Sequence, residues 1–166
     1  KSLEIEPSLV EANLNLGIAL RDWGRLEEAV SCLTEAVRLH PYSPAAHNHL
    51  GLAFHDSGRL KEAAEEFAQA IEINPDYSDA WNHLGIVTQA LGDLSKAVDC
   101  FRRSINIKSD HAGAWNNLGI ALQNAGRISE GIECYRRAFQ IDPSLGQAGN
   151  NLGIALTDIG RLDEAI

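Results

Sequence analysis

The sequence predicts an all-α protein built from repeated pairs of helices. A short motif, Asn-Asn-Leu-Gly-Ile at residues 116–120, has near-copies along the 166-residue chain, and its glycine recurs every 34 residues. A second glycine follows seven residues later and keeps the same period. A fixed period of this size is typical of repeat arrays, in which neighbouring units bury each other's apolar faces. The first glycines are Gly17, Gly51, Gly85, Gly119 and Gly153, and the second glycines are Gly24, Gly58, Gly92, Gly126 and Gly160.

The second glycine of each unit separates two helical patterns. In the first full unit, one helix is expected from about Val10 to Trp23. Another is expected from about Leu26 to Leu39, where apolar residues recur at spacings of three and four. The residues before Val10 are interpreted as the tail of a preceding repeat, whose helix ends at Pro7. The predicted boundaries are 1–9 for this tail, 10–43, 44–77, 78–111 and 112–145 for full repeats, and 146–166 for a truncated repeat.

In the later units, the predicted helix starts carry residue types that are common at such positions. Pro44 is expected at the first position of a helix, where its missing N–H costs nothing. Ser78 and Asp110 are candidate N-caps, because their side chains can accept hydrogen bonds from the first turn.

Each predicted helix has about 14 residues and would be marginally stable in isolation. The first glycines lie inside helices, where glycine costs up to about 1 kcal/mol relative to alanine. We therefore expect these glycines to allow a close approach of two helix backbones, with neighbouring repeats supplying the stability.

The composition excludes several classes of protein. The net charge is −9 and the pI is about 5.0, whereas a nucleic-acid-binding surface needs clustered Lys and Arg. No run of 18 apolar residues predicts a membrane span, and no basic start with an apolar segment indicates a signal peptide. We predict a cytoplasmic protein that neither binds nucleic acid nor inserts into a membrane. Lys1 opens in the middle of a repeat, so the chain is interpreted as a piece of a longer protein.

The three cysteines, Cys32, Cys100 and Cys134, occupy equivalent positions in different units. Packed helices lie roughly 10 Å apart, whereas a disulfide needs Cα atoms within about 7 Å. We therefore predict free, mostly buried thiols.

Each unit also carries one series of residue types: an aromatic residue or histidine, Leu-Gly, a large residue, alanine, an aromatic residue, a small residue and proline. In the second unit the series is His47, Leu50-Gly51, Phe54, Ala63, Phe67, Ala70 and Pro75. In the third it is Trp81, Leu84-Gly85, Thr88, Ala97, Phe101, Ser104 and Ser109. In the fourth it is Trp115, Leu118-Gly119, Leu122, Gly131, Tyr135, Ala138 and Pro143. The series resembles the tetratricopeptide repeat family over essentially the whole chain.

The resemblance implies a right-handed α-solenoid of antiparallel helix pairs. The first helices would line a concave groove, and the second helices would form the outside. Four residues depart from the family pattern, and we expect looser packing around them. They are Thr88, Ser104, Ser109 and Gly131.

Two rows of polar residues lie on the first helices, at positions that the resemblance places in the groove. The first row lies three residues before the first glycine, and the second row lies two residues before it. A side-chain amide offers a donor and an acceptor, which suits pairing with the backbone of an extended peptide. Asn is a mediocre helix former, so helix stability does not explain the rows. The first row is Asn48, Asn82, Asn116 and Asn150, with Leu14 in the first unit, and the second row is Asn15, His49, His83, Asn117 and Asn151.

We predict that these nine polar residues bind a peptide. The alternative is that they are solvated helix residues inherited by repeat duplication. The rows are similar to the asparagine ladder of O-linked N-acetylglucosamine transferases and SPINDLY-type glycosyltransferases, which holds protein substrates by their backbone. Asn15, Asn117 and Asn151 match that ladder, whereas His49 and His83 depart from it. No catalytic glycosyltransferase domain is present in these residues.

Another use of the family is a two-carboxylate clamp that grips an acidic C-terminus with several Lys, Arg and Asn residues. Arg21 is the one strong cation at the expected groove positions. The acidic residues at these positions are Glu11, Asp22, Asp56, Asp79 and Asp158. An acidic peptide would be repelled by them, which disfavours the clamp.

No set of residues predicts an enzyme, a metal site or a cofactor. Zinc needs four ligands around one point, and the ladder histidines of adjacent units are expected to lie too far apart. The cysteines fall on second helices and the ladder histidines on first helices, which disfavours a nucleophile–base pair. The histidines are His40, His47, His49, His55, His83 and His111.

The sequence therefore predicts a protein-interaction scaffold that binds an extended, not strongly acidic polypeptide in its groove. One alternative is the substrate-recognition arm of a glycosyltransferase similar to O-linked N-acetylglucosamine transferase. Another is a structural module that self-associates end to end, because the chain lacks a polar capping helix at its ends.

Overall fold

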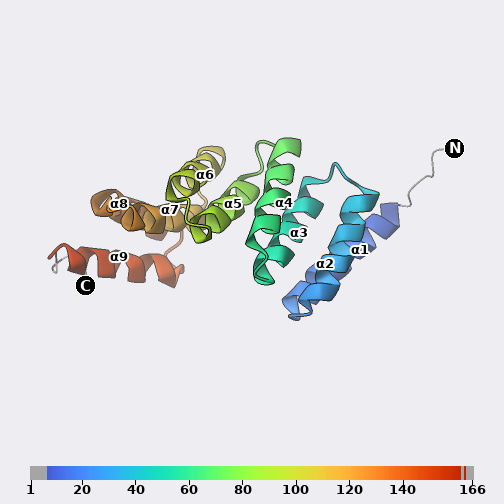
Figure 1. Ribbon diagram of the computed structural model, residues 1–166. Helices are drawn as coiled ribbons and strands as arrows, with labels where there is room; N and C mark the ends of the chain where they lie inside the picture. Colours follow the sequence, from blue (N-terminus) through green and yellow to red (C-terminus); the bar gives the residue numbers. More distant parts are fainter. Residues whose placement is uncertain (1–6, 162, 164–166) are drawn as a thin grey trace. The chain divides into compact units, whose positions relative to one another are not determined.

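The computed structural model describes residues 7–161 and 163, and within them it contains nine helices and no strand (Figure 1). This confirms the predicted all-α class. None of these helices is long and apolar enough to cross a membrane. The helices are α1 (Pro7–Asp22), α2 (Leu26–Leu39), α3 (Pro44–Asp56), α4 (Leu60–Ile73), α5 (Ser78–Ala90), α6 (Leu94–Ile107), α7 (Ala112–Asn124), α8 (Ile128–Ile141) and α9 (Gly146–Asp158).

The chain divides into two compact units, residues 1–87 and residues 88–166, and the boundary between them falls within α5. In the first unit, α1 packs against α2 and α3, α2 also packs against α3, and α3 packs against α4. In the second unit, α7 packs against α6, α8 and α9, and α8 also packs against α9. Each unit is therefore a stack of antiparallel helix pairs, as expected for an α-solenoid.

The second glycines form the turns between the two helices of a repeat. All five have φ between +74° and +91°, a left-handed conformation that other residues adopt only with strain. In the turns at Gly24, Gly58 and Gly126, the arginine after the glycine pairs with a glutamate one helical turn later. One example is Arg25, whose Nη2 lies 2.6 Å from Glu28 Oε2. The second glycine thus recurs because the turn needs a positive φ, which glycine adopts without strain.

The first glycines accommodate side chains from the second helix of the same repeat. A Cβ atom added to Gly51 would lie 2.7 Å from Phe67 Cε1, and one added to Gly119 would lie 2.5 Å from Tyr135 Cε1. The predicted close approach is therefore between a side chain and a backbone, rather than between two backbones. The glycine leaves room for a large buried ring, and Phe67 is only 1% exposed.

Three helix starts differ from the sequence prediction. One is α5, which begins at Ser78 itself, so Ser78 is the first helical residue rather than the N-cap. Helix α1 begins at Pro7 rather than near Val10, because proline fits the first turn of a helix, where its missing N–H is not needed. Residues 7–9 thus belong to α1, and the rest of the predicted tail, residues 1–6, lies outside the described residues. The N-cap of α7 is His111 rather than Asp110, since His111 Nδ1 accepts a hydrogen bond from the Ala114 N–H at 3.2 Å.

The start of α3 is as predicted. Pro44 occupies the first turn, and the hydroxyl of the preceding Ser43 accepts a hydrogen bond from the Ala46 N–H at 3.2 Å. This cap satisfies one of the N–H groups that have no partner within the helix.

The expected looseness around the atypical residues is wrong for three of them. Thr88 is 3% exposed and Ser104 is fully buried. A Cβ atom on Gly131 would lie 3.0 Å from the carbonyl oxygen of Gly119, so α7 and α8 approach closely there. Small residues permit tighter packing at these positions rather than leaving gaps.

The core of the second unit includes a cluster of Ile132, Tyr135, Ala155 and Leu156. All three cysteines are free: Cys100 and Cys134 are buried, and Cys32 is half-buried. Burial raises the pKa of the Cys100 and Cys134 thiols to about 11, so both stay protonated and weakly nucleophilic near neutral pH. The prediction of free, mostly buried thiols is confirmed.

Candidate functional site

Three of the four asparagines in the first row are buried within the helix stack. Asn48 is 3% exposed, Asn82 is 7% exposed and Asn116 is 2% exposed. Asn150, on α9, is exposed. Burying a side-chain amide is costly unless its polar atoms are hydrogen-bonded, so the partners of these amides decide what the row does.

Two of the buried amides, Asn48 and Asn116, accept hydrogen bonds from the second row of the following repeat. In the first unit, His83 Nδ1–H donates to Asn48 Oδ1 at 2.9 Å. In the second unit, Asn151 Nδ2 donates to Asn116 Oδ1 at 3.0 Å. Both bonds join residues 35 positions apart, which is one repeat plus one residue. They tie successive first helices together and fix the orientation of the second-row side chains.

The second row is more accessible than the three buried asparagines of the first row. Asn15 is exposed, whereas His49, His83, Asn117 and Asn151 are half-buried. These side chains can therefore meet a ligand from the solvent side while the buried first row holds two of them in place. Peptide binding by either row stays a prediction.

His49, in the second row, lacks this support. Its Nδ1 is the buried side-chain nitrogen or oxygen for which the described residues provide no hydrogen-bond partner. The first-row position of the preceding repeat holds Leu14, which cannot accept a hydrogen bond. Burial, together with the positive charge of Arg21, lowers the pKa of His49. The imidazole is therefore held in its neutral form.

His47 plays a structural role that the sequence did not reveal. Its Nε2 lies 3.0 Å from the Pro41 carbonyl oxygen, and its Nδ1 lies 2.7 Å from Glu66 Oε2. Trp81 and Trp115, at the same position of the next two repeats, each donate their indole N–H to the carbonyl six residues earlier. His47 makes the equivalent contact to a carbonyl oxygen and adds a second contact, to Glu66. The hydrogen bond to Glu66 raises the pKa of His47.

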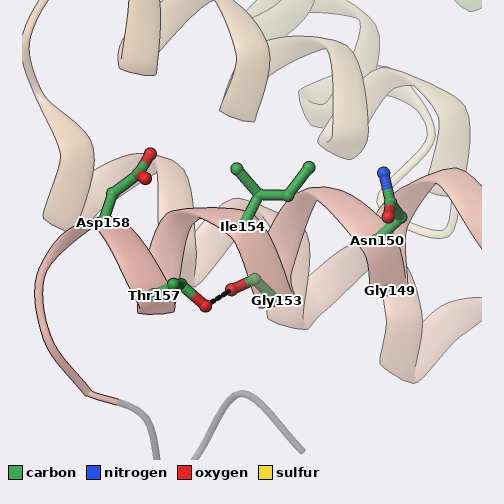
Figure 2. A pocket seen from close by; sticks show the side chains of 6 residues that line it. All are labelled: Gly149, Asn150, Gly153, Ile154, Thr157 and Asp158. Carbon is green, nitrogen blue, oxygen red and sulfur yellow. Dashed lines mark hydrogen bonds between the residues drawn. The ribbon is translucent and has the colours of Figure 1, made fainter.

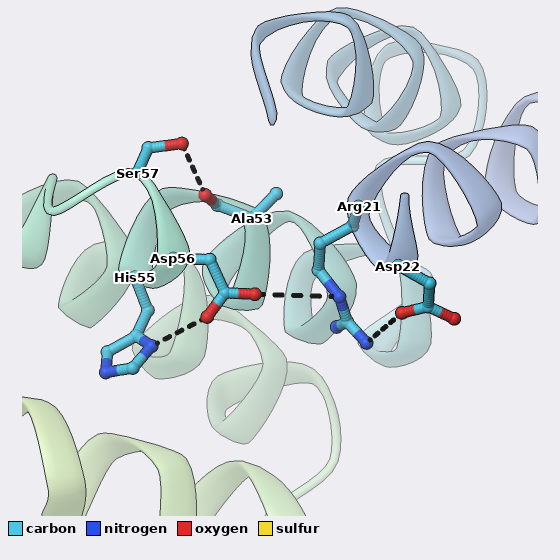
Figure 3. Close-up of polar contacts among 6 residues, drawn as sticks. All are labelled: Arg21, Asp22, Ala53, His55, Asp56 and Ser57. Carbon is cyan, nitrogen blue, oxygen red and sulfur yellow. Dashed lines mark hydrogen bonds and ion pairs between the residues drawn. The ribbon is translucent and has the colours of Figure 1, made fainter. Parts of the chain in front are cut away.

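Arg21 is held between two carboxylates in the first unit (Figure 3). Its Nη2 lies 3.1 Å from Asp22 Oδ1, and its Nε lies 3.7 Å from Asp56 Oδ2. Asp56 also contacts His55, whose Nδ1 lies 3.1 Å from Asp56 Oδ1. The guanidinium is thus already matched by negative charge, and an acidic peptide would have to compete with Asp22 and Asp56 for it.

A small apolar pocket lies in the first unit beside the second row. It has a volume of about 40 Å³ and is lined by α3, α4 and α5. The signal that could have located it is the aliphatic residue directly after each first glycine, of which Leu52 and Ile86 are two. The lining residues are Leu52, His55, Phe67, His83 and Ile86, and we name this feature the Leu52–Ile86 pocket.

Comparison with known protein families agrees with this geometry. Three family models, each described as a tetratricopeptide repeat, match residues 14–78, 54–122 and 112–145. The chain belongs to the tetratricopeptide repeat family. Together the three matches cover every full repeat beyond the first few residues, and they overlap one another along the array.

Solved structures of other tetratricopeptide repeat proteins share the fold. PilF of Pseudomonas aeruginosa has a TM-score of 0.88 at 18% identity, over 95% of this chain and 72% of PilF. MamA of Desulfovibrio magneticus RS-1 has a TM-score of 0.82 at 21% identity, over 95% of this chain and 89% of MamA. YrrB, described as having an unusual peptide-binding site, has a TM-score of 0.72 at 21% identity, over 93% of this chain and 79% of YrrB. No curated protein sequence matches the chain.

One face of α9 is not covered by any of the residues that the structure describes. Asn150, Ile154 and Asp158 project to the same side of the helix (Figure 2), and Ile154 is 49% exposed. With Gly149, Gly153 and Thr157 they line an open concavity of about 510 Å³. Thr157 Oγ1 donates to the Gly153 carbonyl at 2.8 Å, which ties this side chain to its own helix.

Clusters of metal-binding side chains are absent from the described part of the chain. Within residues 7–161 and 163, no three His, Cys, Asp or Glu side chains lie close enough to hold a metal ion. The polar groups of the first unit pair instead with one another, as the His47–Glu66 and Arg21–Asp56 contacts illustrate.

Proposed function

We propose that the chain is a protein-interaction scaffold that binds an extended polypeptide along the face formed by its first helices. Membership of the tetratricopeptide repeat family supports an interaction module. The likeness to YrrB, whose description includes a peptide-binding site, supports a peptide as the ligand.

The observation that carries this proposal is that the two rows have different roles: three first-row amides are buried, and second-row side chains remain accessible. The buried first-row amides Asn48 and Asn116 are occupied by bonds to His83 and Asn151. His83 in the first unit and Asn151 in the second unit are therefore held in orientations that binding does not have to fix. Such preorganisation lowers the entropic cost of binding. Contacts to a peptide backbone would make the site tolerant of different sequences.

The charge of the chain favours a neutral or basic ligand. The net charge is −9, and the partly buried Arg21 is paired with Asp22 and Asp56. A strongly acidic peptide would meet a repulsive field.

The test is binding of a library of unstructured, fluorescently labelled peptides to the chain and to a variant in which Asn15, Asn117 and Asn151 are changed to alanine. The variant should lose binding of all peptides by a similar factor, because it loses contacts to the common backbone. Urea unfolding of the variant measures how much of the loss comes from reduced stability, since Asn151 also bonds to Asn116.

The matched control is Asn124→Ala, which removes an exposed amide near the end of α7, outside both rows. It should bind the library as the wild type does. Binding that survives the triple substitution, or that is lost equally in the control, would contradict a role for the second row.

One alternative keeps the same face but assigns it to a glycosyltransferase. The second-row residues Asn15, Asn117 and Asn151 support it through their similarity to the asparagine ladder of that class. The full-length sequence tests this alternative, because a catalytic domain after Ile166 would support it and a full-length protein without one would eliminate it.

A second candidate function is end-to-end self-association, which is favoured by the face of α9 that the described residues leave uncovered. The exposed Ile154 and Asn150 offer apolar contact and an unburied amide on one side of this helix. Light scattering over a range of protein concentrations tests this candidate, with Ile154→Lys as the variant. A mass that stays monomeric at high concentration would eliminate it.

A further inference from the structure

The Leu52–Ile86 pocket has no part in the proposed contacts to the backbone of a peptide. Leu52 and His55 come from α3, Phe67 from α4, and His83 and Ile86 from α5. All five belong to the first compact unit. Because His83 is also a second-row residue, the pocket opens beside the face proposed to bind a polypeptide.

The base of the pocket is rigid. Phe67 is 1% exposed, and its ring lies directly over Gly51, where a Cβ atom would come within 2.7 Å of Cε1. The ring cannot approach α3 further without meeting the backbone, so its position is determined by packing rather than by a ligand.

One wall of the pocket is held by the buried first row. The His83 ring lies 5.3 Å from the Phe67 ring, centroid to centroid, with an angle of 39° between the two planes. Its Nδ1–H donates to Asn48 Oδ1 at 2.9 Å, and Asn48 is itself buried. The wall is therefore preorganised, and a ligand does not have to order it.

The size and lining of the pocket select a small aliphatic group. A volume of about 40 Å³ exceeds what one water molecule requires. It is small beside the cavities that hold drug-sized ligands, which are typically about 300–1,000 Å³. Leu52, Ile86 and the Phe67 ring offer an apolar surface, which gains free energy when it is removed from water. A side chain of one to three carbons, as in alanine or valine, fits these limits.

The surroundings of the pocket are negatively charged overall. His55 lines the pocket and contacts Asp56, and Asp56 and Asp22 share the single guanidinium of Arg21. Two carboxylates face one arginine, which leaves a net negative charge among these three side chains. A basic side chain next to the aliphatic one would meet a complementary potential there.

We propose that the Leu52–Ile86 pocket receives an alanine- or valine-sized side chain of a bound polypeptide, with a lysine or arginine of the same polypeptide beside it near Asp56. This inference rests on the proposed peptide-binding function and adds a sequence preference to it. The first row then has a second role, because Asn48 positions His83 as a wall of the pocket.

The test is a series of labelled glycine- and serine-rich peptides with one guest residue, Gly, Ala, Val or Phe, followed by either Lys or Glu. Dissociation constants for the whole chain are measured by fluorescence anisotropy. The valine peptide should bind roughly sixtyfold more tightly than the glycine peptide, since each of the three carbon atoms of the buried valine side chain contributes about fourfold. The phenylalanine peptide should lose this advantage because its ring exceeds the pocket, and Lys should be preferred to Glu.

Two variants locate the preference. Ile86→Phe fills the pocket, and its ratio of glycine to valine dissociation constants should fall to about one. The matched control is Ile120→Phe, at the equivalent position after the first glycine of the fourth repeat, which should keep the wild-type ratio. Asp56→Asn should remove the preference for Lys. Methyl NMR of the wild type reports directly on occupation of the pocket, since the methyl resonances of Leu52 and Ile86 should both change in chemical shift when the valine peptide is added.

The outcomes separate this inference from the function on which it rests. Peptides that bind with no preference for valine over glycine, or a preference that Ile86→Phe retains, would overturn the pocket and leave peptide binding standing. If none of the peptides binds to the wild type, both proposals are overturned.

Discussion

At the residue scale, two histidines of α3 have opposite electrostatic environments only two positions apart. His47 has a carboxylate on one nitrogen and a carbonyl oxygen on the other, so the doubly protonated ring satisfies both. His49 is buried with Nδ1 unpaired, so the neutral ring is favoured. One sequence pattern, His-x-His, thus contains one ring whose protonated form is favoured and one ring whose neutral form is favoured.

This difference predicts opposite dependences of stability on pH. The pKa of His47 is raised above its usual 6.5, so its contribution is complete below pH 6.5 and is lost as the pH rises through the folded-state pKa. The pKa of His49 is lowered, so its contribution is present above pH 6.5 and is lost as the pH falls below that value. In the wild type the two effects should partly offset each other.

Urea unfolding between pH 5.5 and 8 can separate them. His49→Leu should leave a free energy of unfolding that decreases as the pH rises, because His47 remains. His47→Trp introduces the residue found at the equivalent positions 81 and 115. This variant should have a free energy of unfolding that decreases as the pH falls, because His49 remains. The other four histidines are common to both variants and cancel in the comparison. Equal slopes in the two variants would show that neither ring is perturbed as described.

At the scale of the elements, the first glycines Gly17, Gly51 and Gly119 limit how closely the two helices of a pair can pack. Tyr135 lies over Gly119, is 1% exposed, and donates its hydroxyl to Gln123 Oε1 at 2.8 Å. The ring is held by burial and by this hydrogen bond, so it has little freedom to move away from a new methyl group.

Gly119→Ala should therefore destabilise the protein although alanine is the better helix former. Overpacking of this kind costs about 1–3 kcal/mol, which outweighs a helix-propensity gain of up to about 1 kcal/mol. Gly146→Ala is the matched control, because a Cβ atom there meets no heavy atom within 4 Å. Thermal and urea unfolding measure both variants. A Gly119→Ala variant as stable as the control would mean that the Tyr135 ring can shift.

At the scale of the whole molecule, stability is shared between neighbouring repeats. Each helix packs on elements of its own or an adjacent repeat, as α7 does with α6, α8 and α9. In such arrays, stability is approximately a sum of repeat and interface contributions. Local openings should then spread over a repeat and its neighbours rather than over the entire chain.

Hydrogen exchange of Gly119→Ala tests this expectation. Amides of α7, α8 and α9 should exchange faster than in the wild type, whereas those of α1 to α4 should change little. Helices at the ends of the described array should exchange faster than central ones already in the wild type. Equal acceleration in every helix would instead indicate one cooperative folding unit.

Much of the architecture could be predicted because it depends on local chemistry. The 34-residue period located the helix pairs, and the second glycines marked turns that need positive φ. Pro44 marked a helix start through its missing N–H. Each of these features acts within a few residues of its own position, so the sequence reports it directly.

The candidate site was predicted less completely, since it depends on which face each neighbour covers. Asn48 and His49 are adjacent in sequence, yet one is buried against the next repeat and the other is partly exposed. Consecutive residues of a helix point about 100° apart, and only the packed partner distinguishes between them. The role of His47, the Leu14 gap beneath His49 and the Leu52–Ile86 pocket all depend on residues brought together from different helices.

The sequence by itself thus determined the repeat, the helix pairs and the residue types along the first helices, because periodicity and turn chemistry are local. Only the tertiary structure decided that the first row hydrogen-bonds inside the stack and that a second-row histidine forms the wall of an apolar pocket. The physical reason is that burial and hydrogen-bond partners come from helices that lie a whole repeat away in the chain.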